Sequence, residues 1–159
     1  MIDYEKTAEQ LRTALSDAGT REVKAKRMAE IIRAHGNYRW VGLYDVNVST
    51  ALVSNIAWSG PRAPAYPTFP ITQGLTSRAI ATRKTVNIGD VAADSDYLVA
   101  LDSTRSEIIV PVLSEDEQQV IGTIDVESEH PNAFDHLTQS FLEECALLIR
   151  SFWSDVTMA

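Results

Sequence analysis

The chain has 159 residues, of which 45% are hydrophobic and 23% are charged, proportions that are ordinary for one globular domain. Its net charge of −8 repels nucleic-acid phosphates and anionic lipid headgroups, so we expect neither a nucleic-acid nor a membrane partner. The only cysteine is Cys145, so no disulfide can form within the chain. The polar N-terminus lacks the features of a signal peptide. Together these features predict a cytoplasmic protein.

Two helices are predicted at the N-terminus, because their apolar residues recur at helical spacing between capping residues. The first spans residues 3–18, with Asp3 as its N-cap, and the second begins after Thr20 and ends at Gly36. We assign residues 1–36 to a helical segment that packs on the remainder, and residues 37–159 to the main part of a single structural domain.

The central part of the chain predicts mainly strands. Residues 38–46 and 51–58 form a hairpin, and four prolines in residues 59–70 indicate a loop, because proline removes a hydrogen-bond donor and fixes φ. A short edge strand at residues 68–71, a helix at 73–83 that Thr72 would cap, and a strand at 85–88 follow.

A long polar connection, residues 89–104, precedes the last elements. Connections longer than about 12–15 residues are usually functional or disordered. Strands at residues 106–113 and 119–127 form a second hairpin, and Asp135 caps a final helix that extends to about residue 156. That helix has two apolar stripes. One can face the sheet, and the other needs cover from the N-terminal helices or from a second chain, which would make a homodimer.

Two acidic residues lie on one face of the last strand. Asp125 and Glu127 are two positions apart, whereas Ile124 and Val126 point to the other face. If the isoleucine and valine pack against helices, the carboxylates face either solvent or a cavity covered by loops. Two carboxylates so close suit an ammonium group, a metal ion or a shared proton, but the sequence does not place enough further ligands for a metal.

Four blocks of the chain resemble the GAF domain family: residues 37–46, 69–91, 104–113 and 120–135. The resemblance extends over about residues 38–153. It implies an α+β fold with a central antiparallel sheet of about five or six strands, the N- and C-terminal helices on one face, and loops with a short helix on the other.

Within that family the chain is most similar to the free methionine-(R)-sulfoxide reductase group. The similarity lies in a W-x-G-x-Y strand starting at Trp40, a strand containing Glu107, and the pair Asp125 and Glu127. In that group the tryptophan helps to enclose the substrate, and the acidic residues hold its amino end and its sulfoxide. The resemblance therefore implies ligand-binding roles for Trp40, Glu107, Asp125 and Glu127.

The loop cysteines of that group are absent from this chain. Their positions correspond to residues 74–77, to residues 99–107 and to the neighbourhood of Ala65 and Tyr66. Sulfoxide reduction by this route requires a thiolate that attacks sulfur and a second thiol that resolves the product. Cys145 lies on an apolar helical stripe, where a cysteine usually serves as a small buried hydrophobe.

These observations predict a small-molecule-binding, sensory or regulatory domain, with an amino-acid-like ligand and without catalytic residues, metal or cofactor. Two alternatives stay open. One is an enzyme like the free methionine-(R)-sulfoxide reductases, which the missing cysteines disfavour, and the other is a dimerisation module without a ligand. A protein partner or an altered dimer would carry any signal onward.

Overall fold

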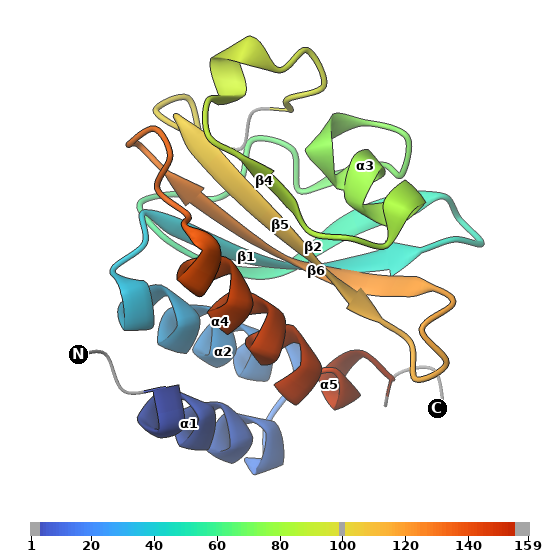
Figure 1. The fold of residues 1–159 in the computed structure, drawn as a ribbon. Helices are drawn as coiled ribbons and strands as arrows, with labels where there is room; N and C mark the ends of the chain where they lie inside the picture. Colours follow the sequence, from blue (N-terminus) through green and yellow to red (C-terminus); the bar gives the residue numbers. More distant parts are fainter. Residues whose placement is uncertain (1–3, 99–100, 155–159) are drawn as a thin grey trace.

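A six-stranded antiparallel sheet with strand order β3-β2-β1-β6-β5-β4 forms the centre of the computed structural model, which describes residues 4–98 and 101–154 (Figure 1). The strands are β1 (Trp40–Asn47), β2 (Leu52–Ser59), β3 (Thr68–Pro70), β4 (Val86–Ile88), β5 (Ser106–Leu113) and β6 (Val120–Ser128). The helices are α1 (Tyr4–Ser16), α2 (Arg21–Gly36), α3 (Gly74–Thr82), the 3₁₀ helix η1 (Val91–Ala93), α4 (His136–Leu148) and α5 (Ser151–Ser154). This arrangement confirms the predicted α+β fold.

The helices α1, α2, α4 and α5 lie on one side of the sheet, and α3 lies on the other (Figure 1). Alternation along the strands explains this layering, since Val41, Leu43, Ile124 and Val126 all belong to the core beneath the helices. His35 connects three of the helices: its ring stacks on Phe141 of α4 with centroids 3.7 Å apart, and its Nδ1 lies 2.7 Å from Thr7 Oγ1 of α1.

The short helix α3 begins differently from its prediction. It starts at Gly74, which has a φ of +74°, and Gln73 occupies the N-cap position without a side-chain cap hydrogen bond. Thr72 is therefore not the cap. The helix ends at Arg83, whose φ of 58° turns the chain toward β4. A left-handed residue is a common way to end a helix.

The C-terminal helix is interrupted, which corrects the predicted continuous helix to residue 156. In the structure α4 stops at Leu148, Ile149 serves as its C-cap, and α5 follows at Ser151–Ser154. The break places Ile149, Phe152 and Trp153 in the interior. The predicted stripes also contained Leu137, which is 78% exposed, and residue 156, which lies outside the described residues.

The second apolar stripe is thus covered largely within the chain. The Trp153 indole packs directly over Gly122 of β6, and its Nε1 donates a 3.0 Å hydrogen bond to the carbonyl oxygen of Tyr44. This stripe gives no separate reason for a homodimer, which stays a prediction. None of the helices within the described ranges is long and apolar enough to cross a membrane.

A candidate ligand cavity lined by buried carboxyl groups

Three acidic side chains gather on the face of the sheet that α3 covers. Glu107 of β5 stands opposite Glu127 of β6 in the strand register, and Asp125 stands opposite Ile109 of β5 and Gly42 of β1. Side chains directly opposite each other across two strands have Cβ atoms about 4.5–5.5 Å apart. The register therefore brings Glu107 and Glu127 into contact range, with Asp125 one pleat away.

All three carboxyl groups are removed from solvent. Glu107 is 4% exposed, Asp125 5% and Glu127 0%, although acidic residues are rarely buried without a partner. Glu127 Oε1 accepts hydrogen bonds from Thr104 Oγ1 at 2.8 Å and from the Tyr97 hydroxyl at 3.3 Å. In contrast, Glu107 Oε2, Asp125 Oδ1 and Glu127 Oε2 are buried without a hydrogen-bond partner.

No cation balances this cluster in the part of the chain that the structure describes. The ion pairs found there all involve other carboxylates. Burial of an ionised carboxylate without a cation is costly, so the neutral acid is favoured.

Protonation of the cluster follows from this environment. Burial raises the pKa of Asp125 to about 7, and burial together with the charge of Asp125 raises the pKa of Glu127 to about 8. Burial, followed by the charges of both neighbours, raises the pKa of Glu107 well above its ordinary value. A hydrogen-bond interaction between Glu107 and Asp125 raises the pKa of Glu107 further and lowers that of Asp125.

The fourth predicted residue, Trp40, lies on the same face but behind the cluster. It is fully buried, opposite Glu127 in the register, and its Nε1 donates a 3.1 Å hydrogen bond to the carbonyl oxygen of Arg62. Its ring occupies the space that side chains would need at Gly42 and Gly60, where an added Cβ would approach ring atoms to 2.3 and 2.4 Å. Trp40 is thus packed rigidly into the buried cluster on this face of the sheet.

A small cavity of about 20 Å³ remains above the carboxyl groups. Its lining comes from the sheet face, α3 and two loops: Tyr44, Tyr66, Phe69, Gly74, Leu75, Thr76, Leu98, Glu107 and Asp125. The volume is close to the space that one water molecule needs. A larger ligand can enter only if the covering side chains move.

The cavity is closed by the connection between β4 and β5, here called the covering loop (residues 89–98 and 101–105). Leu98 abuts Gly74, Leu101 is 2% exposed, and the Tyr97 hydroxyl reaches Glu127. Ion pairs hold the loop from outside. The Arg78 guanidinium of α3 donates to Asp94 at 3.1 Å and to Asp96 at 2.9 Å, and Arg62 pairs with Asp102.

Hydroxyl and aromatic side chains occupy positions at which the resemblance would imply cysteines. Thr76 is 5% exposed and lines the cavity, Ser77 Oγ donates to the carbonyl oxygen of Gly74 at 2.7 Å, and Tyr66 forms part of the rim. Residues 99–100 lie outside the described part. Cys145 is buried on the other side of the sheet, in the core beneath the helices, and burial raises the pKa of its thiol to about 12.

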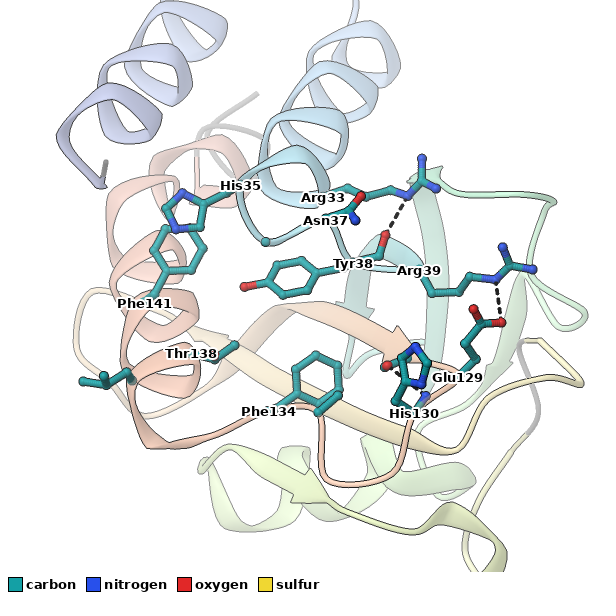
Figure 2. Close-up of a pocket in the computed structure, with 14 residues that line it drawn as sticks. Arg33, His35, Asn37, Tyr38, Arg39, Glu129, His130, Phe134, Thr138 and Phe141 are labelled. Atoms are coloured by element: carbon teal, nitrogen blue, oxygen red, sulfur yellow. Dashed lines mark hydrogen bonds and ion pairs between the residues drawn. The ribbon is translucent and has the colours of Figure 1, made fainter. Parts of the chain in front are cut away.

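A wider hollow of about 780 Å³ lies on the helical side, between the end of α2, the end of β6 and α4 (Figure 2). Its charged and aromatic side chains contact one another: Arg39 pairs with Glu129 at 3.7 Å, and His35 stacks on Phe141. Within the described ranges, none of the buried polar atoms that lack a partner belongs to this hollow. The carboxyl-lined cavity is therefore the stronger candidate site.

The sequence placed Asp125 and Glu127 on one face of their strand, and the resemblance added Glu107 and Trp40. The structure brings all four to one face of the sheet, with Glu107 and Asp125 among the residues that line the cavity. Their role in ligand binding stays a prediction. Sequence reasoning missed Tyr97, which lies in none of the four quoted blocks. Tyr44, Phe69 and Thr104 lie within those blocks but were not predicted as ligand-binding residues. Among the described residues, no group of three or more histidine, cysteine or acidic side chains is arranged to hold a metal ion.

Comparison with known proteins shows which family has this architecture. The sequence model of the GAF domain matches residues 20–151. The chain belongs to the GAF domain family. This GAF domain is 31% identical over 112 residues to free methionine-R-sulfoxide reductase of Saccharomyces cerevisiae, an alignment that covers 69% of this chain and 60% of the yeast protein, so the match spans less than two thirds of that relative.

Two solved structures share the fold of this GAF domain. Free methionine-R-sulfoxide reductase from Neisseria meningitidis, determined in complex with its substrate, has a TM-score of 0.83 and 27% identity, with coverage of 95% of this chain and 88% of that one. The GAF domain of a phosphoenolpyruvate-protein phosphotransferase from Acinetobacter has a TM-score of 0.84 at 14% identity, covering 98% and 95% of the two chains, which supports the fold alone.

Proposed function

We propose that this GAF domain binds a small molecule carrying an ammonium group, such as a free amino acid, in the cavity above Glu107, Asp125 and Glu127, and that it does not reduce that ligand. The observation that carries the proposal is the cluster of three buried carboxyl groups with unpartnered oxygens and no facing cation in the described structure. An ammonium donates up to three hydrogen bonds and supplies the missing positive charge.

The absence of suitable thiols argues against reduction. The reductases of yeast and Neisseria act on free methionine-R-sulfoxide according to their names, and their similarity favours a related ligand here. However, the only thiol of the chain is Cys145, buried on the opposite side of the sheet. The mechanism of this domain would be loop closure over a bound ligand, with Trp40 as part of an apolar floor, and a sensory or regulatory outcome.

Thermal shift measurements test the proposal. A panel of free amino acids that includes both methionine sulfoxide epimers would be screened beside cyclic nucleotides. A ligand at a hundredfold excess over its dissociation constant stabilises the native state by about 2.7 kcal/mol. We expect an amino acid to raise the melting temperature, Asp125→Asn to reduce that rise markedly by weakening binding, and Glu115→Gln, an exposed change outside the cavity, to leave it unchanged.

Turnover needs a separate assay. With methionine-R-sulfoxide and dithiothreitol or thioredoxin as reductant, we expect no methionine to form above the rate without protein. Product formation that Cys145→Ala leaves intact would contradict the non-catalytic assignment and would indicate chemistry without a protein thiol.

A dimerisation module is the second candidate function, because the cavity volume of about 20 Å³ accommodates no amino acid as it stands. Under that alternative the covering loop is a permanent part of the core. No thermal shift with any compound, together with a dimer in sedimentation analysis, would favour it over the ligand-binding proposal.

A further inference from the structure

We infer that the cavity exchanges protons of its own carboxyl groups for the ammonium group of its ligand, so that binding of a small amine releases protons to the solvent. This inference rests on the proposed function, because it concerns the same cavity. It adds a property that the similarity to other GAF domains does not supply: a linkage between ligand affinity and pH.

The first support is the arrangement of the acids. Glu107 and Glu127 are register partners on adjacent strands, and Asp125 shares their face. Each is at most 5% exposed, and each has an oxygen that is buried without a partner. Three carboxylates this close cannot all be ionised without a counter-ion, because each repels the others in a medium that screens charge poorly.

The second support is the set of groups that face the acids. These groups come from β1, from α3, from β3 with its preceding loop, and from the covering loop. In that order they are Tyr44 and Trp40, Leu75 and Thr76, Phe69 and Tyr66, and Tyr97, Leu98 and Thr104. None of these side chains is a cation. Arg62 and Arg78 pair with aspartates of the covering loop, and Arg105 of the loop itself is exposed to solvent.

The empty cavity therefore balances its charge with protons. Burial raises the pKa of Asp125 to about 7, and burial together with the charge of Asp125 raises that of Glu127 to about 8, which agrees with the geometry. The Tyr97 hydroxyl donates a hydrogen bond to Glu127 Oε1. An ammonium N–H would replace this donor when the covering loop shifts.

An amine with a pKa well above neutrality arrives as an ammonium and keeps its three N–H protons. It forms charge-assisted hydrogen bonds to a carboxylate whose proton leaves to a buffer molecule. No bond to carbon changes and nothing is oxidised. For a simple amine such as methylammonium, the net charge of the cavity with its ligand equals that of the empty protonated cavity, so the exchange leaves no uncompensated buried charge.

The affinity for an amine should fall as the pH is lowered. At pH values where the empty site holds protons, each proton released on binding lowers the affinity about tenfold per pH unit of acidification. Affinity for an amine should therefore rise from about pH 6 to about pH 8 and level off once the carboxyl groups ionise without a ligand.

Calorimetric titration of the whole chain tests the inference, with methionine-R-sulfoxide and methylammonium as the two probes. Each probe is titrated at about pH 6.5 in phosphate and in MOPS, two buffers without a primary amine whose heats of ionisation differ, so that the difference in observed heat counts the protons released. We expect about one proton per ligand and a roughly tenfold loss of affinity on going one pH unit lower.

Matched variants locate the source of the protons. Asp125→Asn and Glu107→Gln keep the shape of the side chain and remove one titrating group each, so we expect fewer protons to be released. Glu115→Gln in the exposed turn between β5 and β6 should release as many protons as the unmodified chain. Melting curves of each variant confirm that it folds.

The outcomes separate the inference from the proposed function. Binding of either probe with the same heat in both buffers and the same affinity across the pH range overturns the proton exchange and leaves the proposed ligand class intact. Failure of both probes to bind at any pH overturns the two together. Proton release that persists unchanged in Asp125→Asn and Glu107→Gln assigns it to groups outside the cavity and also overturns the inference.

Discussion

Asp125 and Glu127 are acids whose neutral forms are favoured by the fold. Their pKa values of about 7 and about 8 in the folded chain lie above the ordinary values of 3.8 and 4.5. An acid whose pKa is higher in the folded than in the unfolded chain stabilises the fold fully at pH values below its unfolded-state pKa. That contribution to the free energy of unfolding is lost as the pH rises through its folded-state pKa. The ligand-free protein should lose stability between about pH 4 and pH 8 for this reason.

Urea unfolding of Asp125→Asn checks this prediction. The variant should lose less stability than the parent between pH 5 and pH 8.5, by a few kcal/mol, because one pKa unit corresponds to about 1.4 kcal/mol. Burial lowers the pKa of His35, which acts in the opposite direction as the pH falls, so the difference between variant and parent is the informative quantity. An equal pH dependence in both proteins would contradict the neutral state of Asp125.

Cys145 supports a second prediction about a single residue. Its side chain is fully buried, and burial raises the pKa of its thiol to about 12, whereas reactive cysteines are accessible thiolates. We expect Ellman's reagent to label Cys145 at neutral pH only in denatured protein. Fast labelling of the native protein would show that the helical layer opens far more readily than its packing indicates.

At the scale of elements, Gly122 determines how α5 meets the sheet. A Cβ at this position would lie 2.1 Å from Nε1 of Trp153, so Gly122→Ala should push the indole away and break its hydrogen bond to Tyr44. Overpacking of this kind costs about 1–3 kcal/mol. The free energy of unfolding, measured with tryptophan fluorescence, gives the size of the loss.

A double-mutant cycle provides the control for Gly122. Combining Gly122→Ala with Trp153→Leu removes the ring that the new methyl group meets, so the alanine should then cost clearly less than it does alone. A purely additive result would mean that the glycine is needed for strand conformation rather than for the approach of Trp153.

At the scale of the whole molecule, the covering loop is held to the rest of the domain by ion pairs at its outer surface. Arg78 contacts both Asp94 and Asp96, and exposed pairs of this kind contribute about 0–1 kcal/mol to stability. Arg78→Gln should therefore leave the melting temperature nearly unchanged while it increases amide hydrogen exchange in residues 91–98, since local opening needs less energy than global unfolding.

Arg27→Gln offers a matched comparison for Arg78→Gln. Arg27 forms an exposed pair with Glu30 on α2, at 3.8 Å, away from the cavity. Loss of this pair should leave amide hydrogen exchange in residues 91–98 at the rate seen in the parent protein. If both substitutions, or neither, speed exchange there, the pairs of Arg78 do not restrain the covering loop.

The fold and part of the site could be predicted because both depend on local patterns. The strand alternation placed Asp125 and Glu127 on one face of their strand and Ile124 and Val126 on the other face. The resemblance added Glu107 and Trp40. The predicted cap of α3, Thr72, and the predicted continuous C-terminal helix were wrong, because a left-handed glycine and the burial of Trp153 on the sheet outweigh local helix signals there.

By itself the sequence determined the order and type of most elements, the shared face of the acidic residues, and the restriction of thiol chemistry to Cys145, since these follow from residue identity and from the periods of strands and helices. Only the tertiary structure decided that this face looks into a closed cavity rather than into solvent. That outcome depends on the covering loop and α3, whose contacts with the sheet join residues far apart in the chain, such as Tyr97 and Glu127, and no local period encodes such contacts.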